Sequence, residues 1–178
     1  MKKLLISIRP QWVAKIVSGE KTLEIRKTAP KDLPCEVYIY CTKDKSGMNN
    51  GNTIGRVYPM ETALKTIRGR GKIVASFTLK NTMEFRPFFH WCIEEKSCVS
   101  REKALDYLDN KDKSASNPKR QGKLFAWAID DLKIFDEPKE LYEFKCSKPL
   151  KYSNGKKGKI LFPITKAPQS WCYVEVDE

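Results

Sequence analysis

Three charged side chains, Lys21, Glu24 and Arg26, lie within six residues of one another. An ammonium group can pair with a phosphate or polarise a base carbonyl, and an arginine beside a carboxylate can form a fixed charge pair. Such a pair can read the edge of a nucleobase. The spacing therefore indicates a polar site for an anionic, base-bearing ligand. Two plainer interpretations stay open: Glu24 and Arg26 as a structural ion pair, and Lys21 as a solvated surface lysine.

The residues before this group predict a strand, a short helix and a turn. Residues 4–8 are apolar enough for a first strand, and Pro10 suits the first position of a helix, where its missing N–H costs nothing. The helix continues through residues 11–18 with apolar residues at helical spacing, and Gly19 ends it. The charged group therefore begins directly after a helix-ending turn.

Residues 22–26 alternate between polar and apolar types, which predicts a half-buried strand. Since successive side chains of a strand point to opposite faces, we expect Leu23 and Ile25 to face the core. Glu24 and Arg26 then share the other face, at a separation that allows an ion pair.

Further strands are predicted where apolar and branched residues gather between turn signals. They cover 35–41, 71–79, 125–129, 132–135 and 171–176. Short helices are predicted at 60–68, at 100–109 with Ser100 as the N-cap, and as a turn after Pro138; segments 43–55, 110–123 and 145–159 are predicted loops. The aromatic segment 85–91 carries no clear pattern. Many short strands with few helices indicate a small barrel with peripheral helices.

The charge of the chain favours a polyanionic partner. Thirty-four lysines and arginines against 22 aspartates and glutamates give a formal net charge of +12 at pH 7. Such an excess concentrates polyanions near a protein surface, so nucleic acid is the expected partner. The predicted loops 111–123 and 145–159 are rich in lysine and are expected to contact phosphates weakly. The alternative is that these charges only keep the protein soluble.

Cysteine and histidine usage does not indicate a metal centre or a cofactor. The six cysteines form no C-x-x-C pair, and His90 is the only imidazole in the chain. Cys35, Cys41 and Cys172 lie in apolar, strand-like runs and are expected to pack as reduced thiols. No stretch approaches the roughly 18 consecutive apolar residues that a membrane helix needs, and the apolar run at the N-terminus is too short for a signal peptide. We expect a soluble, cytoplasmic monomer.

The string SGEKTLEIR at residues 18–26 resembles the motif G-x-K-x-x-E-x-R of the ASCH family, phage and bacterial type. The resemblance extends to 71–79, to 124–135 with 138–141, and to the segment PQSWCYVE at 168–175. It implies an α+β fold, a PUA-like small mixed β-barrel with peripheral short helices. The whole chain, 1–178, would form one such domain, with loop insertions near 43–70 and 145–163.

The resemblance also implies a function: a cleft beside the motif that holds RNA or a modified nucleobase, with RNA more expected than DNA. Arg9, at the start of the first helix, would add a phosphate site. Of the four tryptophans, only Trp171 is expected to line the cleft, and the others to lie in the core. The predicted nucleic-acid-binding residues are Arg9, Lys21, Glu24, Arg26, Arg68, Arg70, Gln169, Ser170 and Trp171.

The alternative function is hydrolysis of RNA or of a modified nucleoside. One branch of the family is similar to an amidohydrolase that deacetylates N4-acetylcytidine with a lysine, a threonine three residues later and a glutamate on a later strand. Here the threonine position holds Glu24, and 75–78 contains no acid. The superfamily also suggests metal-assisted cleavage of single-stranded RNA. Glu24 would then be the general base and Lys21 would stabilise the phosphate, with Tyr38 and Tyr40 nearby.

Overall fold

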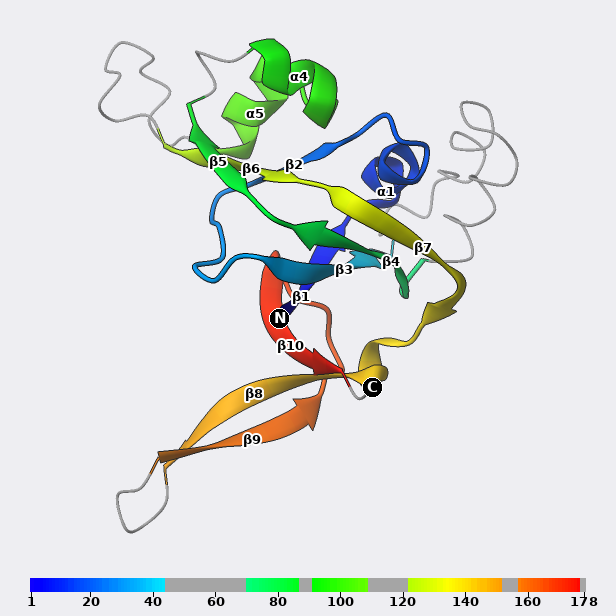
Figure 1. Ribbon diagram of the computed structural model, residues 1–178, viewed down its shortest axis with the longest axis vertical. Helices are drawn as coiled ribbons and strands as arrows, with labels where there is room; N and C mark the ends of the chain where they lie inside the picture. The colour runs from blue at the N-terminus through cyan, green and yellow to red at the C-terminus, as the bar shows by residue number, and fades with distance from the viewer. Residues whose placement is uncertain (44–69, 87–90, 109–121, 152–156, 177–178) are drawn as a thin grey trace.

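The computed structural model describes residues 1–43, 70–86, 91–108, 122–151 and 157–176 (Figure 1). The larger of its two sheets has seven strands in the order β7-β4-β3-β1-β10-β8-β9. Its strands are β1 (Lys2–Ile8), β3 (Cys35–Cys41), β4 (Ile73–Leu79), β7 (Asp130–Lys139), β8 (Phe144–Lys151), β9 (Lys157–Pro163) and β10 (Trp171–Val176). β1 lies at the centre, parallel to β3 and antiparallel to β10.

The smaller sheet has three strands in the order β2-β6-β5. They are β2 (Leu23–Arg26), β5 (Thr82–Phe85) and β6 (Leu124–Ala128). Only Ile129 separates β6 from β7, so one extended segment passes from the smaller sheet to the edge of the larger one (Figure 1). In the described part of the chain these sheets are not closed into a barrel. The predicted α+β class is confirmed, while closure is not.

α4 (Trp91–Ser97) and α5 (Arg101–Tyr107) cover one face of the smaller sheet, and α1 (Pro10–Val17) packs on a face of the larger one (Figure 1). The 3-10 turn η2 spans Leu141–Glu143. Ser100 caps α5 by accepting a hydrogen bond from the Lys103 backbone N–H, as its sequence position predicted. None of the described helices has the length and apolarity needed to cross a membrane.

Three apolar clusters hold these layers together. The first fills the space between the larger sheet, α1 and Trp127 of β6. The second lies on the opposite face of the larger sheet and contains Tyr38, Tyr40 and Phe144. The third packs α4 and α5 against the smaller sheet around Ile25. The smaller sheet is therefore covered on both faces.

Most predicted elements are confirmed, and β3 and β10 begin and end at the predicted residues. One prediction needs correction, and two elements were missed. Segment 145–159 is largely a two-stranded ribbon rather than a loop, because β8 and β9 pair from Lys145↔Pro163 to Lys151↔Lys157. β5 and α4 were not predicted at all. The predicted helix 60–68 and most of loop 110–123 lie outside the described residues.

Candidate functional site

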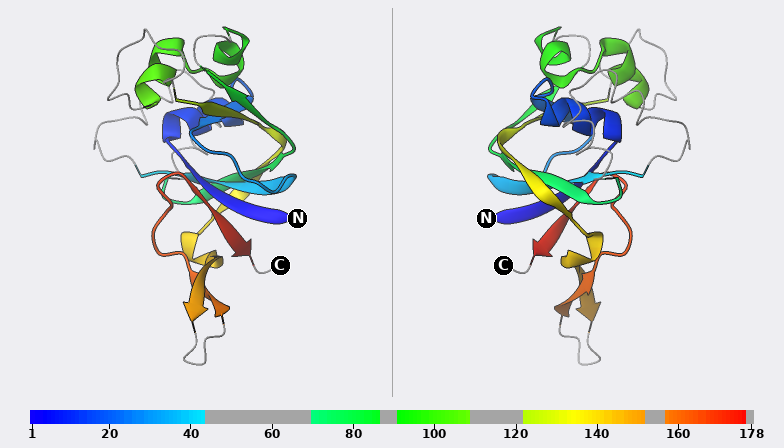
Figure 2. Two further views of the ribbon diagram at one scale, coloured as in Figure 1. Left: turned by 90° about the vertical axis from the view of Figure 1, so that its left-hand side faces the viewer. Right: turned by 90° about the vertical axis from the view of Figure 1, so that its right-hand side faces the viewer.

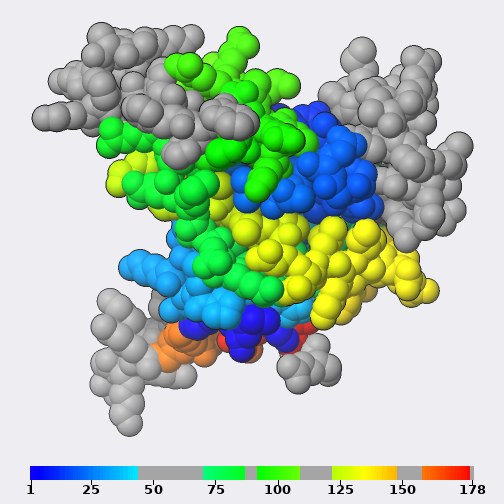
Figure 3. All heavy atoms as spheres, turned by 45° about the horizontal axis from the view of Figure 1, so that its top comes forward, coloured from blue at the N-terminus to red at the C-terminus, as the bar shows by residue number. Residues whose placement is uncertain are grey.

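The motif Lys21, Glu24 and Arg26 begins at a turn that Gly19 makes possible. Gly19 has φ +81°, a left-handed conformation that glycine adopts without steric cost. Its backbone N–H donates to Ile16 O, and that of Lys21 donates to Lys15 O. The Thr22 backbone N–H donates to Lys96 O, which ties the turn to α4. Figure 3 shows this face, where α1 and the turn (blue) lie beside α4 and α5 (green).

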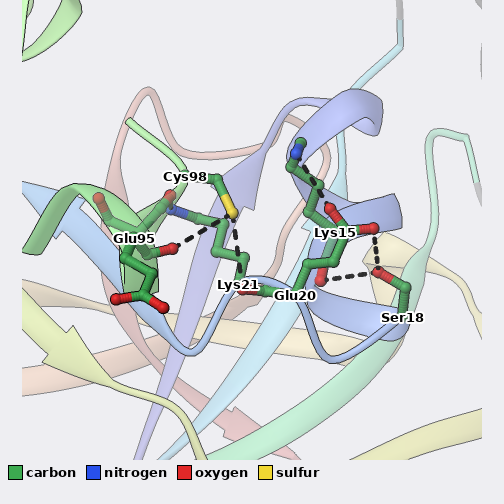
Figure 4. Close-up of polar contacts among 7 residues, drawn as sticks. Lys15, Ser18, Glu20, Lys21, Glu95 and Cys98 are labelled. Atoms are coloured by element: carbon green, nitrogen blue, oxygen red, sulfur yellow. Dashed lines mark hydrogen bonds and ion pairs between the residues drawn. The ribbon is translucent and has the colours of Figure 1, made fainter. Parts of the chain in front are cut away.

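On the outer side of the turn, the polar contacts are exposed. Glu20 pairs with Lys15 at 3.1 Å and accepts a hydrogen bond from the Ser18 hydroxyl. On the other side, the Cys98 thiol lies 3.5 Å from the Glu20 carbonyl oxygen (Figure 4). These contacts fix the path of the chain into β2.

Lys21 points into the protein, with only 1% of its side chain exposed. Its Nζ donates to the Ser97 carbonyl oxygen at 2.6 Å and lies 3.2 Å from Glu24 Oε2. It also lies 5.3 Å from the centre of the Trp12 ring, within the range of a cation–π contact. The interpretation of Lys21 as a solvated lysine is therefore wrong, and its ammonium lies inside the molecule rather than at an open mouth.

Glu24 lies between two cations. One carboxylate oxygen, Oε2, pairs with Lys21, and the other, Oε1, lies 3.1 Å from Arg26 Nη2. The predicted Glu24–Arg26 pair is confirmed, and both side chains are 9% exposed. Since β2 pairs with β6 so that Glu24 lies opposite Trp127, the two share the face turned toward the first cluster. A buried charge is tolerated when it is paired in this way.

Arg26 connects the motif to the centre of the larger sheet. Its Nη2 donates to the Ser7 carbonyl oxygen at 2.7 Å, in addition to pairing with Glu24. Its Nε is buried and has no hydrogen-bond partner in the described part of the chain. Because buried donors are nearly always satisfied, this nitrogen is an unusual unpaired donor next to Ser7.

The segment before β10 also contacts Ser7, the residue whose carbonyl oxygen accepts the hydrogen bond from Arg26. The Ser7 backbone N–H donates to Ser170 O at 2.9 Å, and its hydroxyl donates to Pro168 O at 2.6 Å. Ser7 therefore joins Arg26 to the predicted residues at 169–171. Sequence reasoning missed Ser7, because its contacts join segments that are far apart in the chain.

A row of aromatic rings extends from the contacts around Ser7 toward the surface. Trp127 and Trp171 lie edge to face with ring centres 5.6 Å apart, and Trp171 contacts Tyr173 in the same way at 5.7 Å. The Trp171 Nε1–H donates to Thr28 Oγ1 at 3.0 Å, just beyond β2. Trp127 is buried, Trp171 is half-buried and Tyr173 is 38% exposed. We call Thr28, Gln169, Ser170, Trp171 and Tyr173 the junction edge.

The other predicted binding residues lie in different settings. Arg9 is exposed at the N-cap of α1, directly after β1, and Gln169 is exposed in the junction edge. Arg70 is half-buried, and its Nε and Nη2 are buried without a hydrogen-bond partner among the described residues. Arg68 lies outside the described residues.

Tyr38 and Tyr40 do not join the motif. Both are 7% exposed and belong to the second cluster, where the Tyr38 ring lies 5.0 Å from that of Phe144. Lys21 instead contacts Trp12, which packs on the first cluster, across the larger sheet. The constellation required for RNA cleavage by these four residues therefore does not form.

A shallow depression lies behind the motif strand rather than beside its charges. It is lined mainly by Ile25, Phe85, Ile93, Ser97, Val99 and Ala104. Most of these side chains belong to the third cluster, so the depression marks where α4 and α5 pack on the smaller sheet. No group of three histidine, cysteine, aspartate or glutamate side chains that could hold a metal ion occurs within the described ranges.

Comparison with known proteins gives a fold. No protein-family model matches the chain, and no curated protein matches it in sequence. The chain is similar in structure to ASCH from Zymomonas mobilis, with a TM-score of 0.57 and 17% identity over 98% of this chain and 88% of that one. A tyrosine-to-phenylalanine variant of that protein gives 0.57 and 16%, with 98% and 91% covered. A serine-to-alanine variant gives 0.58 and 16%, with 98% and 89% covered.

Proposed function

We propose, from the premise that this chain has the fold of the ASCH proteins, that it is an RNA-binding module. RNA would contact the junction edge together with Arg9. The observation that carries the proposal is the buried Arg26 Nε, which lacks a partner among the described residues where the motif meets Ser7. A net charge of +12 supplies the long-range attraction.

The proposal divides the predicted site residues into two groups. Lys21, Glu24 and Arg26 are buried and bonded to one another, so they hold β2 and its junction with Ser7 in place. Direct contacts come from the more exposed groups. Arg9 and Gln169 offer donors to phosphate or base edges, and the Trp171 and Tyr173 rings offer surfaces on which a base can stack.

We further propose that the two sheets are parts of a PUA-like barrel and that its cleft opens at the junction edge. A modified or unpaired base would enter there and meet the free Arg26 N–H. Single-stranded RNA suits such a site better than a duplex, because its bases can be splayed out onto aromatic rings. The module would bind as a monomer and without a metal or cofactor.

The geometry favours binding over catalysis. A general base must reach a proton of the substrate with a free lone pair. Both oxygens of Glu24 face cations within the protein, and Lys21 already donates to Ser97 O. Tyr38 and Tyr40 lie in the second cluster. The four residues of the hydrolase alternative therefore do not form an accessible catalytic group.

Titration of a labelled 20-nucleotide RNA of mixed sequence tests the proposal. Gln169→Glu adds one carboxylate at the junction edge, whereas Asn81→Asp makes the same exchange at an exposed amide between β4 and β5. We expect Gln169→Glu to weaken binding about tenfold, which corresponds to ~1.4 kcal/mol. Asn81→Asp should stay within about twofold, because Asn81 does not belong to the junction edge and a charge at an exposed position is screened. Equal affinities of the two variants would refute the junction edge as the contact.

A further inference from the structure

The ribbon formed by β8 and β9 leaves the body of the protein. β10 pairs with β8 only through Glu175↔Lys145 and Val176↔Phe144, at the start of β8. Beyond those pairs β8 and β9 pair only with each other among the described strands. Figures 1 and 2 show the ribbon projecting from the edge of the larger sheet, away from the rest of the protein. We call residues 145–151 and 157–163 the arm.

The arm carries a large share of the excess positive charge. Residues 145–151 and 157–159 contain five lysines and neither aspartate nor glutamate. The next acidic residue along the chain is Glu175. Lys145 lies opposite Glu175 of β10, whereas the lysines farther along β8 and β9 have no acid on either strand, so they attract polyanions independently of sequence. The arm is therefore a cationic projection.

Three consecutive apolar residues of the arm are exposed next to these charges. Ile160 is 38% exposed, Leu161 42% and Phe162 41%. Because neighbouring residues of a strand point to opposite faces, these side chains leave apolar surface on both sides of β9. An aromatic ring among lysines is the combination that binds single-stranded nucleic acid, by stacking and by charge.

We propose that the arm is a second RNA contact, which follows the phosphate backbone of a strand that extends past the junction edge. This inference rests on the proposed function and adds a partner surface to it. The A-form major groove is too narrow for side chains to read, so the arm would lie along the backbone and not inside a groove. A second copy of the chain is a poorer occupant, because two arms of the same high charge repel each other.

The test compares two triple variants that each remove three positive charges. One is Lys148→Gln, Lys151→Gln and Lys159→Gln in the arm. The matched control is Lys31→Gln, Lys103→Gln and Lys133→Gln, at exposed lysines outside it. Binding of a 20-nucleotide and a 6-nucleotide RNA is measured over a series of salt concentrations.

We expect the arm variant to lose about tenfold in affinity for the 20-nucleotide RNA, with the slope of log K against log salt reduced in magnitude by about 2. Its affinity for the 6-nucleotide RNA should stay close to that of the wild type, because the short strand occupies the junction edge and does not reach the arm. The control variant should keep most of the wild-type slope. Phe162→Ser should reproduce part of the loss without changing the slope, because it removes stacking and no charge.

Two results would overturn the arm as a contact while leaving the proposed function intact. In the first, the arm and control variants have equal slopes, although Gln169→Glu still weakens binding of the short RNA. In the second, light scattering shows a wild-type dimer that the arm variant dissociates, which would make the arm an interface between copies. Failure of the wild type to bind either RNA would instead remove the proposed function itself.

Discussion

At Glu24 a single carboxylate serves two buried cations. Lys21 Nζ and Arg26 Nη2 lie 3.2 and 3.1 Å from its two oxygens. Taking charges out of water is costly, and the mutual attraction compensates only while the set is complete. The protein thus keeps a charged group in its interior because each member is bonded to another.

The first prediction concerns Glu24→Gln. This change leaves two buried cations without a counter-charge, so it should lower the free energy of unfolding by about 3–5 kcal/mol. Chemical denaturation measures the effect. Glu20→Gln is the control, because Glu20 pairs with Lys15 at an exposed site where a pair contributes ~1 kcal/mol or less. Similar stabilities of the two variants would show that the buried ion pairs do not hold the motif.

The second prediction concerns the thiols. Burial raises the pKa of Cys41 to about 12, and burial together with the nearby Asp32 carboxylate raises that of Cys35 to about 11. At pH 8 an alkylating reagent should therefore label exposed Cys92 and leave Cys35 and Cys41 unmodified, as mass spectrometry of the peptides would show. Labelling of Cys41 in the folded protein at a rate like that of Cys92 would contradict this packing.

The same pKa values fix the sign of a pH effect. Their folded values lie above the ordinary value of 9.0, so the neutral thiols contribute stability that is fully present below about pH 9. This contribution is lost as the pH rises toward 11 and 12. Denaturant midpoints between pH 7 and pH 10.5 should accordingly fall at the alkaline end.

Among the elements, the turn between α1 and β2 sets the direction of the motif strand. Gly19 takes a left-handed conformation and has open space around it. Gly19→Val should destabilise the protein by about 1–2 kcal/mol through backbone strain alone. Gly19→Asn should cost less, because asparagine tolerates that conformation. Unfolding experiments on both variants test this, and equal losses would mean that φ at this position is not the cause.

The sequence predicts local elements well where their periodicity is strong. α1, with Pro10 at its start and Gly19 after its end, follows from start and stop signals that act over one turn. β3 and β10 are rich in branched and aromatic residues, which favours a strand over other elements.

The elements that sequence reasoning missed depend on distant partners. The lysine-rich composition of 145–159 indicates a loop, yet β8 and β9 are held by pairing with each other across the ribbon. Alternation in β2 predicts its two faces correctly. The burial of Glu24 and Arg26 does not follow from it, because the covering Trp127 and Ser7 come from other strands. Ser97, which accepts from Lys21, also lies far away in the chain.

For the whole molecule, charge and shape support the same interpretation. The body presents the junction edge, and the arm extends from it with five lysines on β8 and β9. Each phosphate neutralised by a lysine or arginine releases a counterion, so binding energy comes largely from salt-sensitive contacts. Affinity for RNA should therefore increase with strand length until both surfaces are occupied.

A salt titration of the wild-type chain with the 20-nucleotide RNA tests the central claim most directly. We predict a linear fall of log K with log salt, with a slope of about −3 to −5 for five to seven phosphate contacts on a single strand. An oligonucleotide that fails to bind at the lowest salt concentration, or binds with an affinity that salt does not change, would contradict the account.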